Sequence, residues 1–159
     1  FAFTMVRQYL LDEFELMLFT ALSDSSDETL AAISSKALKE IHYHHRRSKE
    51  WLYRLGRGSV ESHQRTQRAI NEIWGYVHEL FEMDDLDNRL VAAEIGVDRA
   101  KLKKPWDERI QSVMKKADLR IPTEEWEITG GRSGIHTENL DHLLVEMQFL
   151  QRAYPGQTW

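Results

Sequence analysis

Residues 3–22 are apolar on nearly every face of the helix that their spacing predicts. One stripe recurs every three or four residues, the period of an α-helix, through Val6, Leu10, Phe14, Met17 and Ala21. The other faces also carry apolar side chains, at Tyr9, Leu11, Leu16, Leu18, Phe19 and Leu22. A helix with no polar face must be covered on all sides by other elements. The segment is therefore predicted to be the central helix of a bundle.

Two long helices are expected next. The cluster of Ser and Asp at 23–27 predicts a turn ending in an N-cap, followed by a helix with Glu28 in its first turn. The stripe of that helix runs to Leu55, and Gly56 ends it. Ser59 is expected to cap a third helix that continues through Phe81. Because the connection is short, these two helices are predicted to be antiparallel.

The second half of the chain predicts shorter helices. An acidic stretch at 83–87 interrupts the pattern, and a short helical segment follows before Gly96. Pro105 suits a helix start, and Pro122 marks an end. The expected buried face of that helix is Trp106, Ile110, Val113, Met114 and Ala117. After a glycine-rich loop at 129–134, a last helix opens at Thr137 and Glu138 and is ended by Pro155 and Gly156, with a stripe of Leu140, Leu143, Leu144, Met147 and Leu150. No strand pattern of comparable length occurs, so the fold class is all-α.

Composition narrows the functional classes. The chain has 159 residues, 42% of them hydrophobic, which suits a single domain over residues 1–159. A formal net charge of -5 argues against nucleic acid or an anionic membrane as partner. No apolar run is long enough to span a bilayer, and the start lacks the layout of a signal peptide. The absence of cysteine excludes thiolate chemistry and suits the cytoplasm.

Glu40 and His44 are the leading metal-ligand candidates, because ferritin-like bundles hold metals with inward carboxylates and imidazoles. The Glu-x-x-His spacing of diiron bundles is broken here, since Tyr43 stands three residues after Glu40. A second such motif is also absent after Glu72. Glu13 is a further carboxylate near an apolar stripe, where it would need a partner. The alternative is a buried network of Glu, His and Tyr that fixes the register of the helices.

The segment 42–49 concentrates basic and imidazole side chains. His42 and His45 are one turn apart, and Arg46, Arg47 and Lys49 could hold phosphates such as those of coenzyme A. The alternative is an ordinary solvated helix face. The glycine-rich loop lacks the Gly-Lys-Ser/Thr of a phosphate loop, so its glycines are expected to permit positive φ. No nucleophile elbow or cysteine nucleophile is present.

Five tryptophans suggest an interface. Trp51 and Trp74 are expected to meet in the core, and Trp51→Ala would cost about 3–5 kcal/mol if that side chain were fully buried. Trp126 and Trp159 lie in less regular segments and are the better interface candidates.

Several segments resemble one known family. In the first half they are residues 7–12 (RQYLLD), 30–34 (LAAIS) and 51–56 (WLYRLG). In the second half they are residues 129–138 (TGGRSGIHTE), 146–152 (EMQFLQR) and 155–159 (PGQTW). Together they are similar to the structural subunits of bacterial phenylacetyl-CoA epoxidases, the multicomponent monooxygenases of phenylacetate degradation. The resemblance covers essentially the whole chain.

The resemblance implies a ferritin-like fold and a non-catalytic role. Such subunits support a homologous catalytic subunit that carries the diiron chemistry, so no catalytic, cofactor-binding or metal residue is assigned to this chain. Other subunits of the complex, and a second copy of the chain, are the expected partners. Family members carry further helices before the region that begins here, so the chain is expected to lack the first helices of the bundle. The competing hypothesis is a metal-binding enzyme in its own right that uses Glu40 and His44.

Overall fold

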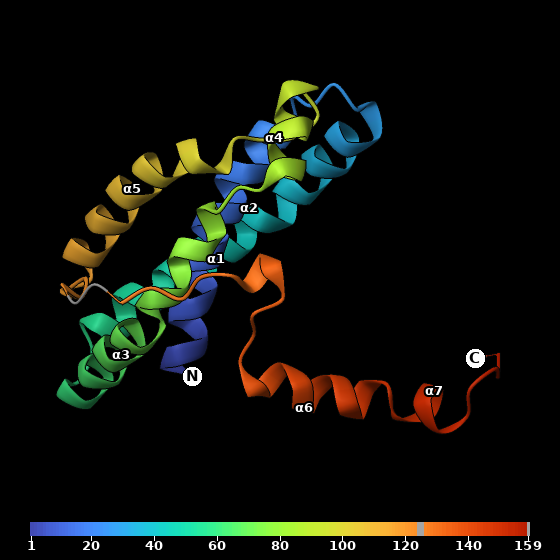
Figure 1. Cartoon of the computed structure of the whole chain (residues 1–159). Helices are drawn as coiled ribbons and strands as arrows, with labels where there is room; N and C mark the ends of the chain where they lie inside the picture. The colour runs from blue at the N-terminus through green and yellow to red at the C-terminus, as the bar shows by residue number, and fades with distance from the viewer. Residues whose placement is uncertain (124–125, 159) are drawn as a thin grey trace.

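The computed structural model describes residues 1–123 and 126–158, and over these residues the chain is helical without a strand (Figure 1). The all-α prediction is confirmed. The α-helices are α1 (Ala2–Leu22), α2 (Glu28–Gly56), α3 (Val60–Ile73), α4 (Asp85–Ala92), α5 (Lys103–Lys116), α6 (Glu138–Met147) and α7 (Phe149–Ala153). Three short 3-10 helices are η1 (Trp74–Phe81), η2 (Arg99–Leu102) and η3 (Gly131–Ser133).

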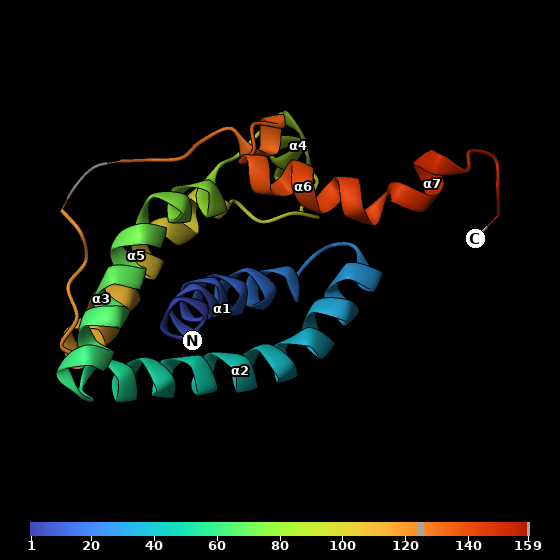
Figure 2. The same ribbon diagram turned by 90° about the horizontal axis from the view of Figure 1, so that it is seen from below.

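Helix α1 is the centre of the bundle, as its apolar surface predicts. It contacts α2, α3, α5 and η2, and Figure 2 shows it enclosed by the other helices. Its inward residues Val6, Tyr9 and Leu10 are almost completely buried. They join one core with residues from α2, α3, η1 and α5. Burying apolar side chains contributes about 1.5–3 kcal/mol each, so this helix organises the fold.

Helices α2 and α3 begin at the caps that the sequence predicts. The Asp27 carboxylate accepts a hydrogen bond from the Leu30 N–H at 2.9 Å, and the Ser59 hydroxyl accepts one from Ser62 at 3.2 Å. Gly56 is the last helical residue rather than the first one beyond the helix. Helix α3 reverses the direction of α2, as the antiparallel prediction requires, but it diverges from α2 instead of lying along it (Figures 1 and 2).

The third helix does not continue as one α-helix through Phe81. It changes to the 3-10 helix η1 at Trp74, next to Gly75. The Gly75 carbonyl accepts a hydrogen bond from the Ile128 N–H at 3.0 Å, and the Trp126 indole lies against Gly75 so closely that a Cβ there would collide with it. Glycine is a weak helix former, and here it lets a distant segment approach the backbone.

Helix α5 covers α1 with the face that the sequence predicts. Trp106, Ile110, Val113 and Met114 are all buried, and Ala117 follows them into the core. Pro105 lies in the first turn of the helix, where its missing N–H costs no hydrogen bond. The Trp106 indole N–H donates to the Leu10 carbonyl at 3.2 Å, so the buried ring has a partner for its polar atom.

The tryptophan pairing differs from the prediction. Trp51 is only half-buried and packs edge-on against Phe1 at 5.0 Å, so the premise of full burial is wrong. Trp74 pairs instead with Trp106 at 6.0 Å. The fully buried side chain of that part of α2 is the neighbouring Leu52. At this point of α2, Leu52 rather than Trp51 joins the core.

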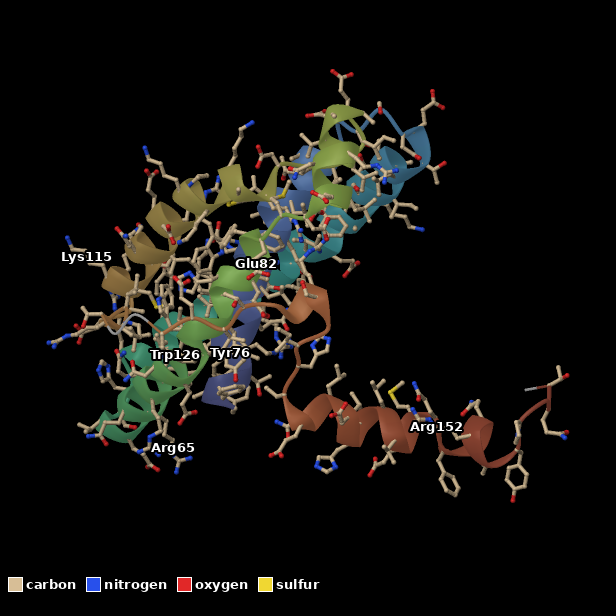
Figure 3. The ribbon with its side chains drawn as sticks, in the orientation of Figure 1. Arg65, Tyr76, Glu82, Lys115, Trp126 and Arg152 are labelled. Carbon is tan, nitrogen blue, oxygen red and sulfur yellow. The ribbon has the colours of Figure 1, made fainter. Side chains whose placement is uncertain are left out.

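The two tryptophans proposed for an interface have different outcomes. Trp126 is half-buried and packs within the chain, at 5.7 Å and nearly perpendicular to Tyr76. Figure 3 shows the two labelled side chains next to each other. Trp159 lies outside the described residues.

Helices α6 and α7 lead away from the bundle to the C-terminal end (Figures 1 and 2). The sequence predicts one helix ending at Pro155. The helix instead breaks at Gln148 and resumes as the short helix α7, which has five residues. Within the described residues, no helix combines the length and apolarity needed to cross a membrane.

Leu52→Ala tests this core. Leu52 is 0% exposed, so the substitution is expected to lower the free energy of unfolding by about 2–5 kcal/mol. Leu86→Ala, at a side chain that is 55% exposed, is the matched control and is expected to change it by less than about 1 kcal/mol. Urea unfolding followed by circular dichroism measures both. Equal losses for the two variants would contradict the placement of Leu52.

Candidate functional site

The candidate metal ligands do not come together. Glu40 and His44 are exposed on α2, Glu72 is exposed on α3, and Glu13 is buried on α1. Over residues 1–123 and 126–158, no three His, Cys, Asp or Glu side chains are grouped closely enough to hold a metal ion. The structure therefore gives the set of Glu13, Glu40, His44 and Glu72 no common centre.

The buried Glu13 instead joins three helices. Its Oε2 lies 2.7 Å from the Nε2 of His45 on α2 and accepts a hydrogen bond from the Tyr9 hydroxyl at 3.2 Å. Its Oε1 accepts a hydrogen bond from the Arg109 guanidinium on α5 at 3.1 Å. The carboxylate thus has the partner that its position requires. A buried network of Glu, His and Tyr does exist, but it is built on Glu13 and His45 rather than on Glu40 and His44.

Asp12, the neighbour of Glu13, is the second buried carboxylate of α1. Its Oδ2 accepts a hydrogen bond from the Ser48 hydroxyl at 2.6 Å, and its Oδ1 accepts one from the Gln8 amide at 2.6 Å. His45 and Ser48 are three residues apart on α2, so adjacent carboxylates of α1 meet the same face of α2. Four hydrogen-bonding side chains in this interface fix the register of the two helices.

The electrostatics of the network keep Glu13 charged. Burial acts to raise the pKa of Glu13, but the hydrogen bond and charge of His45, followed by those of Arg109, outweigh it and lower the pKa. The pKa of Tyr9 is raised, first by burial and then by the neighbouring Glu13 charge. Tyr9 therefore remains a neutral hydrogen-bond donor.

This donor set does not fit the metal centre that a ferritin-like bundle suggests. Both oxygens of Glu13 are engaged by protein donors, and the cationic Arg109 lies where a second cation would be repelled. Both oxygens of Asp12 also accept hydrogen bonds from neutral side chains. The arrangement can hold helices together, and it offers no open ligand position.

Sequence reasoning missed Arg109. It is 96 residues from Glu13 in the sequence. It lies on a helix for which the sequence analysis predicted only a buried apolar face. No local spacing links the two residues. Asp12 carried a weak signal, because it lies in a helix that is apolar on nearly every side and must be buried with it.

The basic segment of α2 is divided between two faces. His42, Arg46 and Arg47 are exposed, while Lys49 is half-buried. His45 points inward to Glu13, so it does not share the exposed face of His42, from which it is one turn away. The Arg46 guanidinium lies 6.0 Å from the centre of the Tyr43 ring.

The glycine-rich loop is fastened to an acidic cluster at the end of η1 and the start of α4. Gly130 and Gly134 have φ of 88° and 86°, which confirms the predicted need for glycine. The Arg132 guanidinium donates to Asp84 at 2.7 Å and to Asp87 at 2.8 Å, and the Gly131 N–H donates to Glu79 at 3.0 Å. The loop therefore serves as a packed connection to α6.

The same acidic cluster is also held from within the bundle. Arg99 donates to Asp87 and to the Glu82 carbonyl, both at 2.6 Å. The pKa of Asp84 is lowered to about 2 by the hydrogen bond from the Asp87 backbone N–H and then by Arg132. Asp84 is therefore ionised at neutral pH and available to pair with the loop.

Comparison with known proteins decides the family. The family described as phenylacetic acid catabolic protein matches residues 1–159. The chain belongs to this family. This family has a ferritin-like fold, so the fold that the resemblance implies is confirmed.

One curated member of this family is similar over the whole chain. The Escherichia coli (strain K12) protein named as the C subunit of 1,2-phenylacetyl-CoA epoxidase is 46% identical over 159 residues. The match covers 100% of this chain and 64% of the relative. The chain thus spans a little under two thirds of the length of this relative.

Glu13→Gln tests the buried network. Removing the charge leaves Arg109 without its counter-ion and weakens the hydrogen bond with His45, so a loss of about 2–4 kcal/mol in the free energy of unfolding is expected at pH 7. Because the pKa of Glu13 is lowered by folding, its contribution is complete above the unfolded value of about 4.3. It is lost as the pH falls through the lower pKa of the folded state.

Urea unfolding of both proteins at a series of pH values measures this difference. Glu50→Gln, at an exposed position of α2, is the control and is expected to change stability little at any pH. A difference between wild type and Glu13→Gln that did not shrink as the pH fell below about 4 would be incompatible with the network.

Proposed function

We propose that this chain is the structural subunit of a monooxygenase complex that epoxidises the ring of phenylacetyl-CoA in aerobic phenylacetate catabolism. In this role it supports a homologous diiron catalytic subunit. The observation that carries the proposal is the 46% identity, over the whole chain, with a protein named as one subunit of such an epoxidase.

The buried network supports a non-catalytic role. The inward carboxylates Asp12 and Glu13 are the residues best placed to hold a metal inside the bundle, and their oxygens are already engaged by the side chains around them. The proposal accordingly assigns no catalytic, cofactor-binding or metal residue to this chain. It treats residues 1–159 as one ferritin-like unit.

The main proposed partner is the catalytic subunit of the complex. The other subunits, and a second copy of this chain, are further proposed partners. Nucleic acid and membrane are not among them, because the chain is acidic with a net charge of -5. The proposal includes a cytoplasmic location, which a sequence without cysteine favours.

Co-expression with the cognate catalytic subunit, followed by purification and iron analysis, tests the proposal. We expect a stable complex whose iron is accounted for by the catalytic subunit. The chain purified without that subunit is expected to hold much less than one iron per molecule after exposure to ferrous iron.

Stoichiometric iron in the isolated chain would overturn the proposal in favour of a metal-binding enzyme. Glu40→Ala and His44→Ala would then be expected to abolish that iron, with Glu50→Ala as the control at another exposed carboxylate of α2. A catalytic subunit that is stable, active and fully assembled without this chain would also contradict the proposed role.

A further inference from the structure

The 3-10 helix η1 is unusually long. It has eight residues, Trp74–Phe81, whereas 3-10 runs longer than about three or four residues are uncommon because their hydrogen bonds are poorly aligned. It also continues α3 without a break, since Trp74 ends one helix and begins the other. The sequence has the spacing of an α-helix here, with Ile70, Trp74, Val77 and Phe81 on one face. A contact from outside the segment must therefore favour the 3-10 form.

Residues 126–132, which we call the strap, pass along η1 on the way from α5 to α6 (Figures 1 and 2). The Ile128 N–H donates to the Gly75 carbonyl at 3.0 Å. In an α-helix that carbonyl accepts from the N–H four residues later, so the strap supplies from outside a donor that an α-helix supplies from within. The Trp126 indole occupies the space beside Gly75 that a Cβ would fill.

Two further contacts fasten the strap to the middle of η1. The Gly131 N–H donates to the Glu79 carboxylate at 3.0 Å. The Oε1 of Glu127 lies 3.2 Å from the Nδ1 of His78. Together with the contacts at Gly75, they are distributed over most of η1, so the strap acts on the segment as a whole.

The type of helix determines how far η1 reaches. A 3-10 helix rises about 2.0 Å per residue and an α-helix about 1.5 Å, so eight residues span about 4 Å more in the 3-10 form. Only residues 82–84 connect η1 to α4, and both Glu82 and Asp84 are already extended. Because an extended connection has no slack, a shorter η1 would pull α4 toward α3.

The other end of α4 is bound to the turn between α1 and α2. The Ser26 N–H donates to the Glu94 carbonyl at 2.9 Å, and the Ser25 hydroxyl donates to the Ile95 carbonyl at 2.7 Å. Hydrogen bonds are lost when donor and acceptor separate beyond about 3.5 Å, so a displacement of about 4 Å would break them. The 3-10 form of η1 is thus the form in which α4 reaches this turn.

We propose that the strap holds residues 74–81 in the 3-10 form, and that its release lets them become α-helical and withdraws α4 from the turn between α1 and α2. The segment then has two discrete arrangements, and the strap determines which one is adopted. The device operates within one chain and goes beyond the proposed function, on which it does not depend.

Two variants of the full chain, one on each side of the same contact, test the strap by NMR spectroscopy. Trp126→Ala removes the indole and leaves the sequence of η1 unchanged. Gly75→Ala places a Cβ where the indole lies and displaces it. Trp51→Ala, at another half-buried tryptophan outside the strap, is the control.

The first measurement is the pattern of short proton–proton distances over residues 74–81. Contacts from an Hα to the N–H four residues later mark an α-helix, and contacts to the N–H two residues later mark the tighter 3-10 helix. We expect only the two-residue contacts in the wild type and in Trp51→Ala. Both strap variants are expected to show the four-residue contacts.

The second measurement is hydrogen exchange of the Ser26 amide, which reports the distant end of α4. It is expected to be at least about ten-fold faster in both strap variants, because the hydrogen bond that protects this amide is lost. In the control it is expected to stay within about two-fold of the wild type, because the strap is intact.

A 3-10 pattern that persisted in either strap variant would overturn the inference. Conversion in Gly75→Ala alone would be due to the higher helix propensity of alanine, so both variants must convert. Four-residue contacts in the wild type would also overturn it, as would conversion of η1 with Ser26 exchange unchanged. Loss of the folded signals of α1 and α2 in both variants would contradict it too, because a strap must be separable from the folded bundle.

Discussion

The burial of α1 is the constraint on which the rest of the structure depends. Its surface is apolar on almost all sides, so the other helices are arranged to cover it. Asp12 and Glu13, the two buried carboxylates of this helix, need partners from outside. Ser48 and His45 of α2 and Arg109 of α5 supply them. The apolar surface therefore makes the helices pack together, and the polar network determines in which register they pack.

Features encoded within a few residues could be predicted from the sequence. The apolar periodicity of α1 and the buried face of α5 follow from side-chain spacing, and the caps at Asp27 and Ser59 follow from local hydrogen bonding. Features that depend on distant segments could not. The change to a 3-10 helix at Gly75 involves Ile128 and Trp126, and the pairing of Glu13 involves Arg109. The inward turn of His45 was missed for the same reason, because its neighbours suggested a solvated basic face.

The candidate site and the proposed role are consistent with one another. Ferritin-like bundles that carry out metal chemistry place open ligand positions between facing helices. Here the corresponding interior holds hydrogen-bonded carboxylates, and many of the exposed apolar side chains lie in α6 and α7. In the proposed role, the chain acts within the complex through its surfaces, and the buried carboxylates serve its own folding.

The pairing of Glu13 with Arg109 also bears on the order in which the chain assembles. During synthesis α1 and α2 leave the ribosome well before α5, and contacts between residues so far apart close late because of the entropy of the intervening loop. Until α5 docks, the hairpin of α1 and α2 must hold the Glu13 carboxylate with His45 and Tyr9 alone, with one side of α1 open to water. The docking of α5 both covers that side of α1 and brings Arg109 to Glu13. The hydrogen bond between Arg109 and Glu13 therefore forms only when α5 packs in its correct position on α1.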